Sequence, residues 1–119
     1  MKKKHFLFTA LFAFILNVSA QESIVKDVFA RFVEDKVERM QQLIGFDDKQ
    51  ADQLKELEIK FLIDVNAAEN CFWCRSKKRI EKLKKQRDKD LQLILTREQY
   101  IKYNAIDNNL IQKNPQVQL

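Results

Sequence analysis

Apolar side chains recur every three or four residues through most of the chain, which is the spacing of amphipathic helices. A first stripe covers residues 25–44 and stops at Gly45, where a left-handed glycine commonly ends a helix. A second stripe covers 54–68, and a thinner third one covers 80–95. A short fourth helix is expected from residue 97 to about 108. The pattern therefore predicts helices and no strands.

Two segments share a helix-start pattern, in which an apolar residue precedes a capping residue and a Gln follows three positions after the cap. They read FDDKQ at 46–50 and LTREQ at 95–99. Asp47 and Thr96 are predicted N-caps, and Gln50 and Gln99 complete the spacing of a capping box. We expect these four residues to shape helix ends rather than to perform chemistry.

The predicted fold is all-α, an elongated helical hairpin of three to four helices. The apolar pattern loosens around residues 66–74, which indicates either a turn or a helix irregularity. Gln86 and Arg87 interrupt the third stripe. One Gly and one Pro among 119 residues are too few for a many-stranded sheet or a glycine-rich phosphate loop. A single helical domain is expected over residues 21–108, followed by a flexible tail at 109–119.

The N-terminus has the three parts of a secretory signal peptide at residues 1–20. Lys2, Lys3 and Lys4 precede an apolar run at 6–16, and small residues end at Ala20. The alternative is an uncleaved anchor, which the shortness of the apolar run disfavours. We therefore expect cleavage after Ala20 and a periplasmic protein.

Export changes the chemistry that the chain offers. The only histidine, His5, lies in the predicted signal peptide, so the mature chain has no Ser-His-Asp or Cys-His mechanism. We expect no enzymatic activity, no cofactor and no metal. Three of the positive charges behind the formal +5 also leave with the signal.

The remaining charge is divided along the chain. Residues 75–89 carry nine basic side chains against two acidic ones, whereas residues 21–74 carry 7 basic and 12 acidic ones. One interpretation is that the two regions neutralise each other across the hairpin, with Glu56 and Glu58 facing the basic residues. The other is a cationic surface for acidic or unfolded clients or for anionic lipid head groups. Nucleic acid is not expected, because the basic block lacks interleaved aromatic residues. The candidate binding residues are Lys78, Arg79, Lys82, Lys85 and Lys89 for charge, with Phe61, Phe72 and Trp73 for apolar contacts.

The only two cysteines, Cys71 and Cys74, stand at CxxC spacing. In an oxidising compartment the pair favours a structural disulfide. An inter-chain disulfide or a metal site shared between two chains are alternatives, whereas a thioredoxin-type redox site needs a βαβ context. Phe72 and Trp73 would then be core residues at the hairpin tip or an exposed apolar contact.

The paired motifs, the helical pattern and the predicted export resemble the LTxxQ family of periplasmic stress proteins, the Spy/CpxP group. The segment 95–99 matches the motif fully, 46–50 keeps only its apolar, capping and Gln positions, and the CxxC pair lies outside the family pattern. The resemblance implies a bent hairpin that dimerises into a curved cradle. It also implies an ATP-independent chaperone or envelope-stress accessory protein, with unfolded or envelope protein clients and at most weak membrane contact. A metal or redox sensor at the CxxC pair, and a structural protein with one fixed partner, are the alternative functions.

Overall fold

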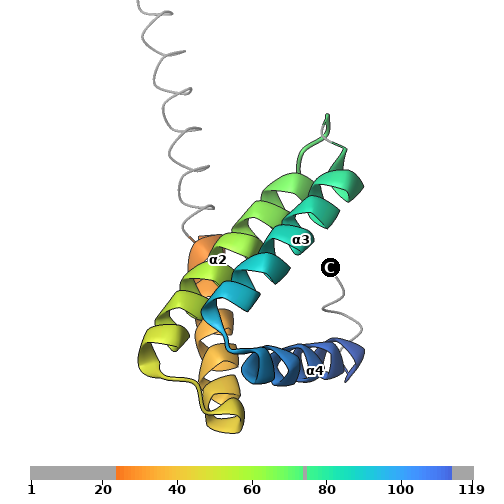
Figure 1. Ribbon diagram of the computed structural model, residues 1–119. Helices are drawn as coiled ribbons and strands as arrows, with labels where there is room; N and C mark the ends of the chain where they lie inside the picture. The colour runs from red at the N-terminus through yellow and green to blue at the C-terminus, as the bar shows by residue number, and fades with distance from the viewer. Residues whose placement is uncertain (1–23, 74, 114–119) are drawn as a thin grey trace, which may run out of the picture.

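The structure is a computed structural model that describes residues 24–73 and 75–113. These residues form four helices and no strand, so the all-α prediction is confirmed (Figure 1). A helix covers residues 24–44, followed by α2 (Asp48–Glu69), α3 (Ser76–Ile94) and α4 (Arg97–Lys113). The predicted signal peptide at 1–20 lies outside the described residues, and so do residues 114–119.

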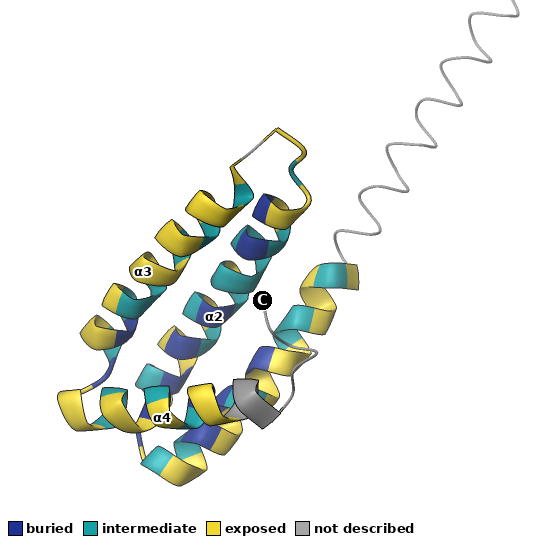
Figure 2. Cartoon of the chain, turned by 90° about the vertical axis from the view of Figure 1, so that its right-hand side faces the viewer, coloured by how far each residue is buried: buried dark blue, intermediate teal, exposed yellow. Residues whose placement is uncertain are grey.

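The central unit is an antiparallel hairpin of α2 and α3, which pack along each other (Figure 1). The helix at 24–44 lies against one side of this hairpin, and α4 crosses near the end where α2 begins and α3 ends (Figure 2). The turn that joins α2 to α3 extends past both. One face of the hairpin is therefore covered, and the other faces solvent.

The hydrophobic core gathers at the end of the hairpin opposite the turn, and Figure 2 shows buried positions on α2, on the 24–44 helix and at the end of α3. Burying such side chains contributes roughly 1.5–3 kcal/mol each, so this end is the stable part of the molecule. The buried core cluster consists of Val33, Val37, Met40, Phe46, Ala51, Leu54, Leu91, Leu95 and Tyr103.

The helix starts have the geometry that the sequence pattern predicts. The Asp47 carboxylate accepts a hydrogen bond from the Gln50 backbone N–H at 2.7 Å, and the Gln50 Oε1 accepts one from the Asp47 N–H at 3.0 Å. Thr96 and Gln99 exchange the corresponding pair at 3.3 and 3.0 Å. Gly45 follows the first helix with φ +85°, the left-handed conformation that favours glycine.

One helix end differs from the prediction. Helix α4 continues to Lys113, so residues 109–113 of the predicted flexible tail are helical. Polar Asn and Gln residues after 108 only weaken a helix slightly. The stronger stop signal is Pro115, which disfavours the helical conformation at the residue before it. No helix in the described part of the chain is long and apolar enough to cross a membrane.

Candidate functional site

The five basic residues predicted to bind a partner all lie on α3 and are exposed to solvent. At 3.6 residues per turn their positions fall within about 120° of one face of the helix. By the same helical geometry, Leu93 falls within this arc, between Lys82 and Arg79. This set, which we call the cationic face, consists of Lys78, Arg79, Lys82, Lys85 and Lys89.

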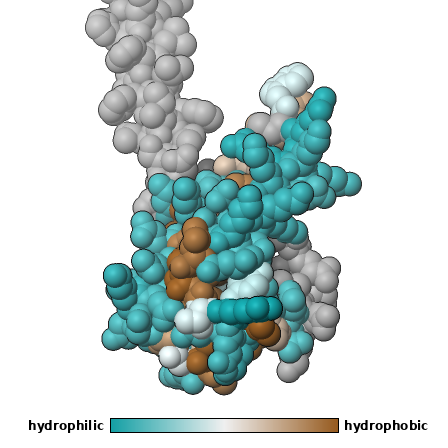
Figure 3. Space-filling model, viewed as in Figure 1, coloured by the Kyte–Doolittle hydropathy of each residue, from teal (hydrophilic) through white to brown (hydrophobic). Residues whose placement is uncertain are grey.

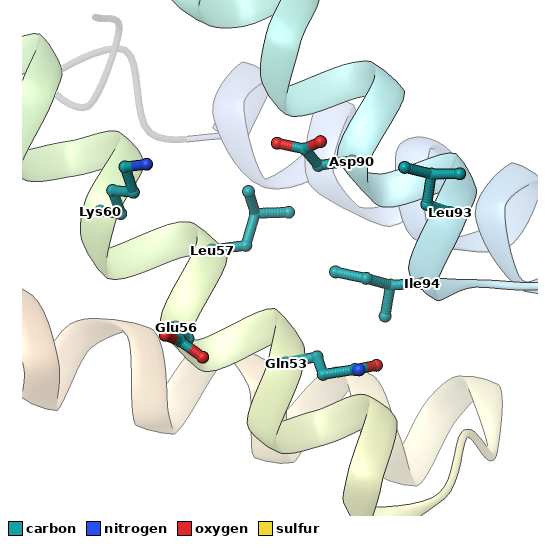
Figure 4. A pocket seen from close by; sticks show the side chains of 7 residues that line it. All are labelled: Gln53, Glu56, Leu57, Lys60, Asp90, Leu93 and Ile94. Carbon is teal, nitrogen blue, oxygen red and sulfur yellow. The ribbon is translucent and has the colours of Figure 1, made fainter.

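A shallow open groove runs between α2 and α3 on the solvent-facing side of the hairpin (Figure 4). Its apolar members are Leu57, Leu93 and Ile94, and 83% of Leu93 is exposed. In the close view the 24–44 helix and α4 lie behind the hairpin, so neither covers the groove. Its polar lining consists of Gln53, Glu56, Lys60 and Asp90. Figure 3 shows apolar atoms reaching this surface of the molecule among hydrophilic ones.

The hairpin tip carries two aromatic side chains in solvent. Phe72 is 90% exposed and Trp73 is 91% exposed, and their rings meet edge to face at 5.4 Å. Of the two roles considered for these residues, a core role is wrong because both are exposed, and the role as an apolar contact stays a prediction. Cys71 is half-buried in the same turn. Cys74 lies outside the described residues, so the bond between the cysteines stays a prediction.

Inside the bundle, one charged residue from each helix meets in a single cluster. Lys36 Nζ lies 2.8 Å from Asp107 and 3.7 Å from Glu58. Arg87 donates from Nε to both Glu58 carboxylate oxygens at 3.1 Å and from Nη2 to Asp107 at 3.1 Å. The Tyr103 hydroxyl donates to Glu58 at 2.8 Å. Two cations thus balance two carboxylates, and we call this set the ionic cluster.

Burial and charge set the protonation of the ionic cluster. Burial alone would lower the pKa of Arg87, but Glu58 and then Asp107 outweigh it and raise that pKa. Burial, followed by the charge of Glu58, raises the pKa of Tyr103 and keeps its hydroxyl a donor. For Asp107, burial would raise the pKa, but Lys36 and then Arg87 lower it below the ordinary value. Arg87 and Asp107 are therefore charged around neutral pH, and Tyr103 keeps its proton.

Phe61, predicted as an apolar contact for a partner, is partly engaged within the fold. The Arg87 guanidinium lies over its ring, 5.2 Å from the centroid, and the side chain is half-buried. A cation over an aromatic face is attracted by the ring quadrupole. Phe61 thus forms part of the wall of the ionic cluster.

The sequence interpretation anticipated the ionic cluster only in part. Glu58 does face the basic block, since it binds Arg87, whereas Glu56 is exposed at the groove. The roles of Lys36 and Asp107 were missed. Each of the four charged residues stands at a three- or four-residue step from apolar core positions, as Glu58 does after Leu54. A charged residue on a buried helix face was the available signal.

The two capping boxes also contact each other. Gln50 Nε2 donates to Gln99 Oε1 at 2.8 Å and to the Ile94 carbonyl at 3.0 Å. The capping residues thereby join the starts of α2 and α4 to the end of α3, a contact that the separate motifs did not predict.

No group of three or more His, Cys, Asp or Glu side chains that could hold a metal ion occurs within residues 24–73 and 75–113. No family model, curated protein or solved structure matches the chain. The similarity to the LTxxQ family therefore rests on the two motifs and their arrangement.

Proposed function

We propose that the protein is an exported, non-enzymatic helical binding protein, an ATP-independent chaperone or envelope-stress accessory protein that holds unfolded clients. The observation that carries this proposal is the solvent-facing side of the hairpin, where the apolar groove at Leu57, Leu93 and Ile94 adjoins the cationic face of α3. A single exposed apolar side chain is common on protein surfaces. Leu93 differs because it lines a groove together with other apolar side chains.

The two parts of this surface have different tasks in the proposed mechanism. The cationic face raises the rate of encounter with acidic segments, an effect that salt weakens because the Debye length is about 8 Å at physiological ionic strength. The groove then covers apolar side chains of the client, at roughly 25 cal/mol per Å² removed from water. An open groove binds many sequences weakly, which suits a holding function.

The fold presents this surface without rearrangement. The ionic cluster and the Gln50–Gln99 hydrogen bond fix the hairpin against the other two helices from behind. A preorganised surface loses less conformational freedom on binding than a disordered one. Client binding in this form requires no nucleotide.

An aggregation assay with a chemically unfolded acidic client at low salt tests the proposal. Equimolar protein should suppress light scattering, and the protection should weaken in Leu93→Ser and in the double variant Lys82→Glu/Lys85→Glu. Ile101→Ser on α4 and Lys49→Glu at the start of α2 are matched controls, because both residues are exposed and lie outside the groove and the cationic face. Absence of protection by the unmodified protein would overturn the proposal.

A homodimer is part of the same proposal, and an exposed stripe on the 24–44 helix favours it. Ile24, Val28 and Phe32 follow one another at four-residue steps and are 63%, 59% and 47% exposed. Such a stripe suits a partner helix. Sedimentation analysis should give a dimer, and Val28→Glu together with Phe32→Glu should give a folded monomer. A monomer at all concentrations for the unmodified protein would contradict the dimer.

A further inference from the structure

The tip of the hairpin has no role in the groove or in the core. Phe72 and Trp73 stand in the turn between Glu69 and Ser76, at the end of the hairpin that extends past the other helices. Both rings are about nine-tenths exposed and contact each other edge to face. Two adjacent large aromatic side chains in water are unfavourable unless another apolar phase covers them.

The beginning of α3, beside these rings, is unusually cationic. Its first turn has no acidic residue, and its N-cap, Arg75, makes no side-chain capping hydrogen bond. Lys77 and Lys78 occupy that turn and are exposed. Cations at a helix N-terminus oppose the helix dipole, so this arrangement weakens α3 locally. The acidic side chain nearest in sequence on the other side of the turn is Glu69 at the end of α2, which leaves the tip net positive.

We propose that this tip docks on an anionic phospholipid surface. Phe72 and Trp73 enter the interfacial layer, and Arg75, Lys77 and Lys78 reach the lipid phosphates. Aromatic rings with an apolar body favour the membrane–water interface, Trp above all. Each cation near an anionic leaflet strengthens binding about fivefold. This inference concerns a second partner and goes beyond the proposed client binding.

The shape of the tip favours a membrane over a protein partner. Both rings project from the turn into solvent, where a flat surface can cover them at once. Charge complementarity points in the same direction, because the side chains that flank the rings in the first turn of α3 are cationic. The proposed contact with the membrane is peripheral, because two aromatic rings and three cations give reversible binding.

Trp73 is the only tryptophan of the chain, so its fluorescence reports the tip directly. The protein from the exported fraction is titrated with vesicles of phosphatidylglycerol and phosphatidylcholine, and with phosphatidylcholine vesicles alone. We expect a blue shift of the emission with the anionic vesicles, reversal at high salt, and quenching by lipids brominated near the head group. Inorganic phosphate alone should leave the emission unchanged.

Variants separate the tip from general electrostatic attraction. Lys77→Gln with Lys78→Gln should weaken vesicle binding about 25-fold, and Phe72→Ser should reduce the blue shift. Lys49→Gln and Leu93→Ser are controls at the other end of the hairpin and should leave the titration unchanged. Circular dichroism checks that each variant stays folded, which is expected because all these side chains are exposed.

Three results would overturn the inference. The first is no blue shift with anionic vesicles, and the second is an equal shift with neutral ones. The third is a shift caused only by an unfolded protein client, which would assign the tip to protein binding. The aggregation assay without lipid tests the proposed function separately, so either idea can fail alone.

Discussion

Gln50 and Gln99, separated by 49 positions in the sequence, are joined by a hydrogen bond of 2.8 Å from Nε2 to Oε1. Each also closes its own capping box through Oε1. The two residues nevertheless have different requirements. Gln50 needs its amide N–H groups, because it donates to Gln99 and to the Ile94 carbonyl. Gln99 needs only its side-chain oxygen, which accepts from Gln50 Nε2 and from the Thr96 backbone N–H.

Glutamate at the two positions should therefore have unequal effects. Gln50→Glu keeps a capping acceptor but places a carboxylate oxygen against the Ile94 carbonyl and Gln99 Oε1. Two hydrogen bonds are lost and acceptors face each other, so we expect the free energy of unfolding to fall by about 2 kcal/mol. Gln99→Glu retains both acceptor contacts and should change stability by less than about 0.5 kcal/mol. Urea denaturation at pH 7 measures both, and equal losses would contradict the asymmetry.

The ionic cluster predicts a specific response to acid. The pKa of Asp107 is lower in the folded protein than its ordinary value of 3.8, since Lys36 and Arg87 outweigh burial. A depressed carboxyl pKa contributes stability that is complete above about pH 4 and is lost as the pH falls through the folded value. The free energy of unfolding should therefore decrease below pH 4.

Asp107→Asn tests this acid response. The variant should lose about 3 kcal/mol at pH 7, because two buried cations then face one carboxylate. Its stability should fall less steeply below pH 4 than that of the unmodified protein. Parallel acid profiles for the two proteins would show that Asp107 does not carry the acid dependence.

Arg87 should not be replaceable by lysine. Its guanidinium contacts both oxygens of Glu58 and one of Asp107 in a fixed plane, whereas an ammonium is a point charge. Arg87→Lys should cost about 2 kcal/mol in thermal or urea unfolding. Lys89→Arg, the reverse exchange on the exposed side of the same helix, should stay within about 0.5 kcal/mol.

Gly45 allows a test of backbone strain without steric conflict. A Cβ at this position would meet nothing within 4 Å, so the cost of Gly45→Ala comes from φ +85° alone. We expect Gly45→Ala to lower the free energy of unfolding by about 1 kcal/mol. Gly45→Asn should lower it less, because asparagine tolerates the left-handed region. If asparagine were no better than alanine, strain at this residue would not be the cause.

The predicted Cys71–Cys74 disulfide leads to a labelling experiment. If the bond forms, the protein isolated without reductant should react with no thiol reagent, and after reduction it should take up two labels per chain. Reduction should leave its solution mass unchanged if the bond is within one chain. A mass that halves on reduction would instead indicate a bridge between chains.

The sequence predicted the parts of the fold that local chemistry determines. The caps at Asp47 and Thr96 and the glycine helix end at Gly45 depend on neighbouring residues, and their positions followed from spacing alone. The hairpin of α2 and α3 followed from the loosened apolar pattern before the basic block. The end of α4 lies later than the predicted residue 108, because the polar residues that follow it weaken a helix only slightly.

Contacts between distant segments could not be predicted from local patterns in the sequence. Lys36 and Asp107 are 71 positions apart, and although each stands on an apolar helix face, that local pattern does not show which residues pair. The net charge of residues 75–89 does not reveal this arrangement either, because Arg87 points into the bundle whereas Lys85 points into solvent. The exposed rings at Phe72 and Trp73 depend on how the turn projects, which a sequence pattern does not specify.

The ionic cluster also determines when the chain can finish folding. It takes one side chain from each helix, and the last of these, Asp107, lies close to the C-terminus. A chain that ends before α4 has Lys36 and Arg87 against Glu58 alone, and it also lacks the hydroxyl of Tyr103. An incomplete chain therefore has one positive charge in excess at this place and lacks the helix that completes the cluster. The hairpin can form early during synthesis, but the bundle becomes stable only once the final helix has emerged.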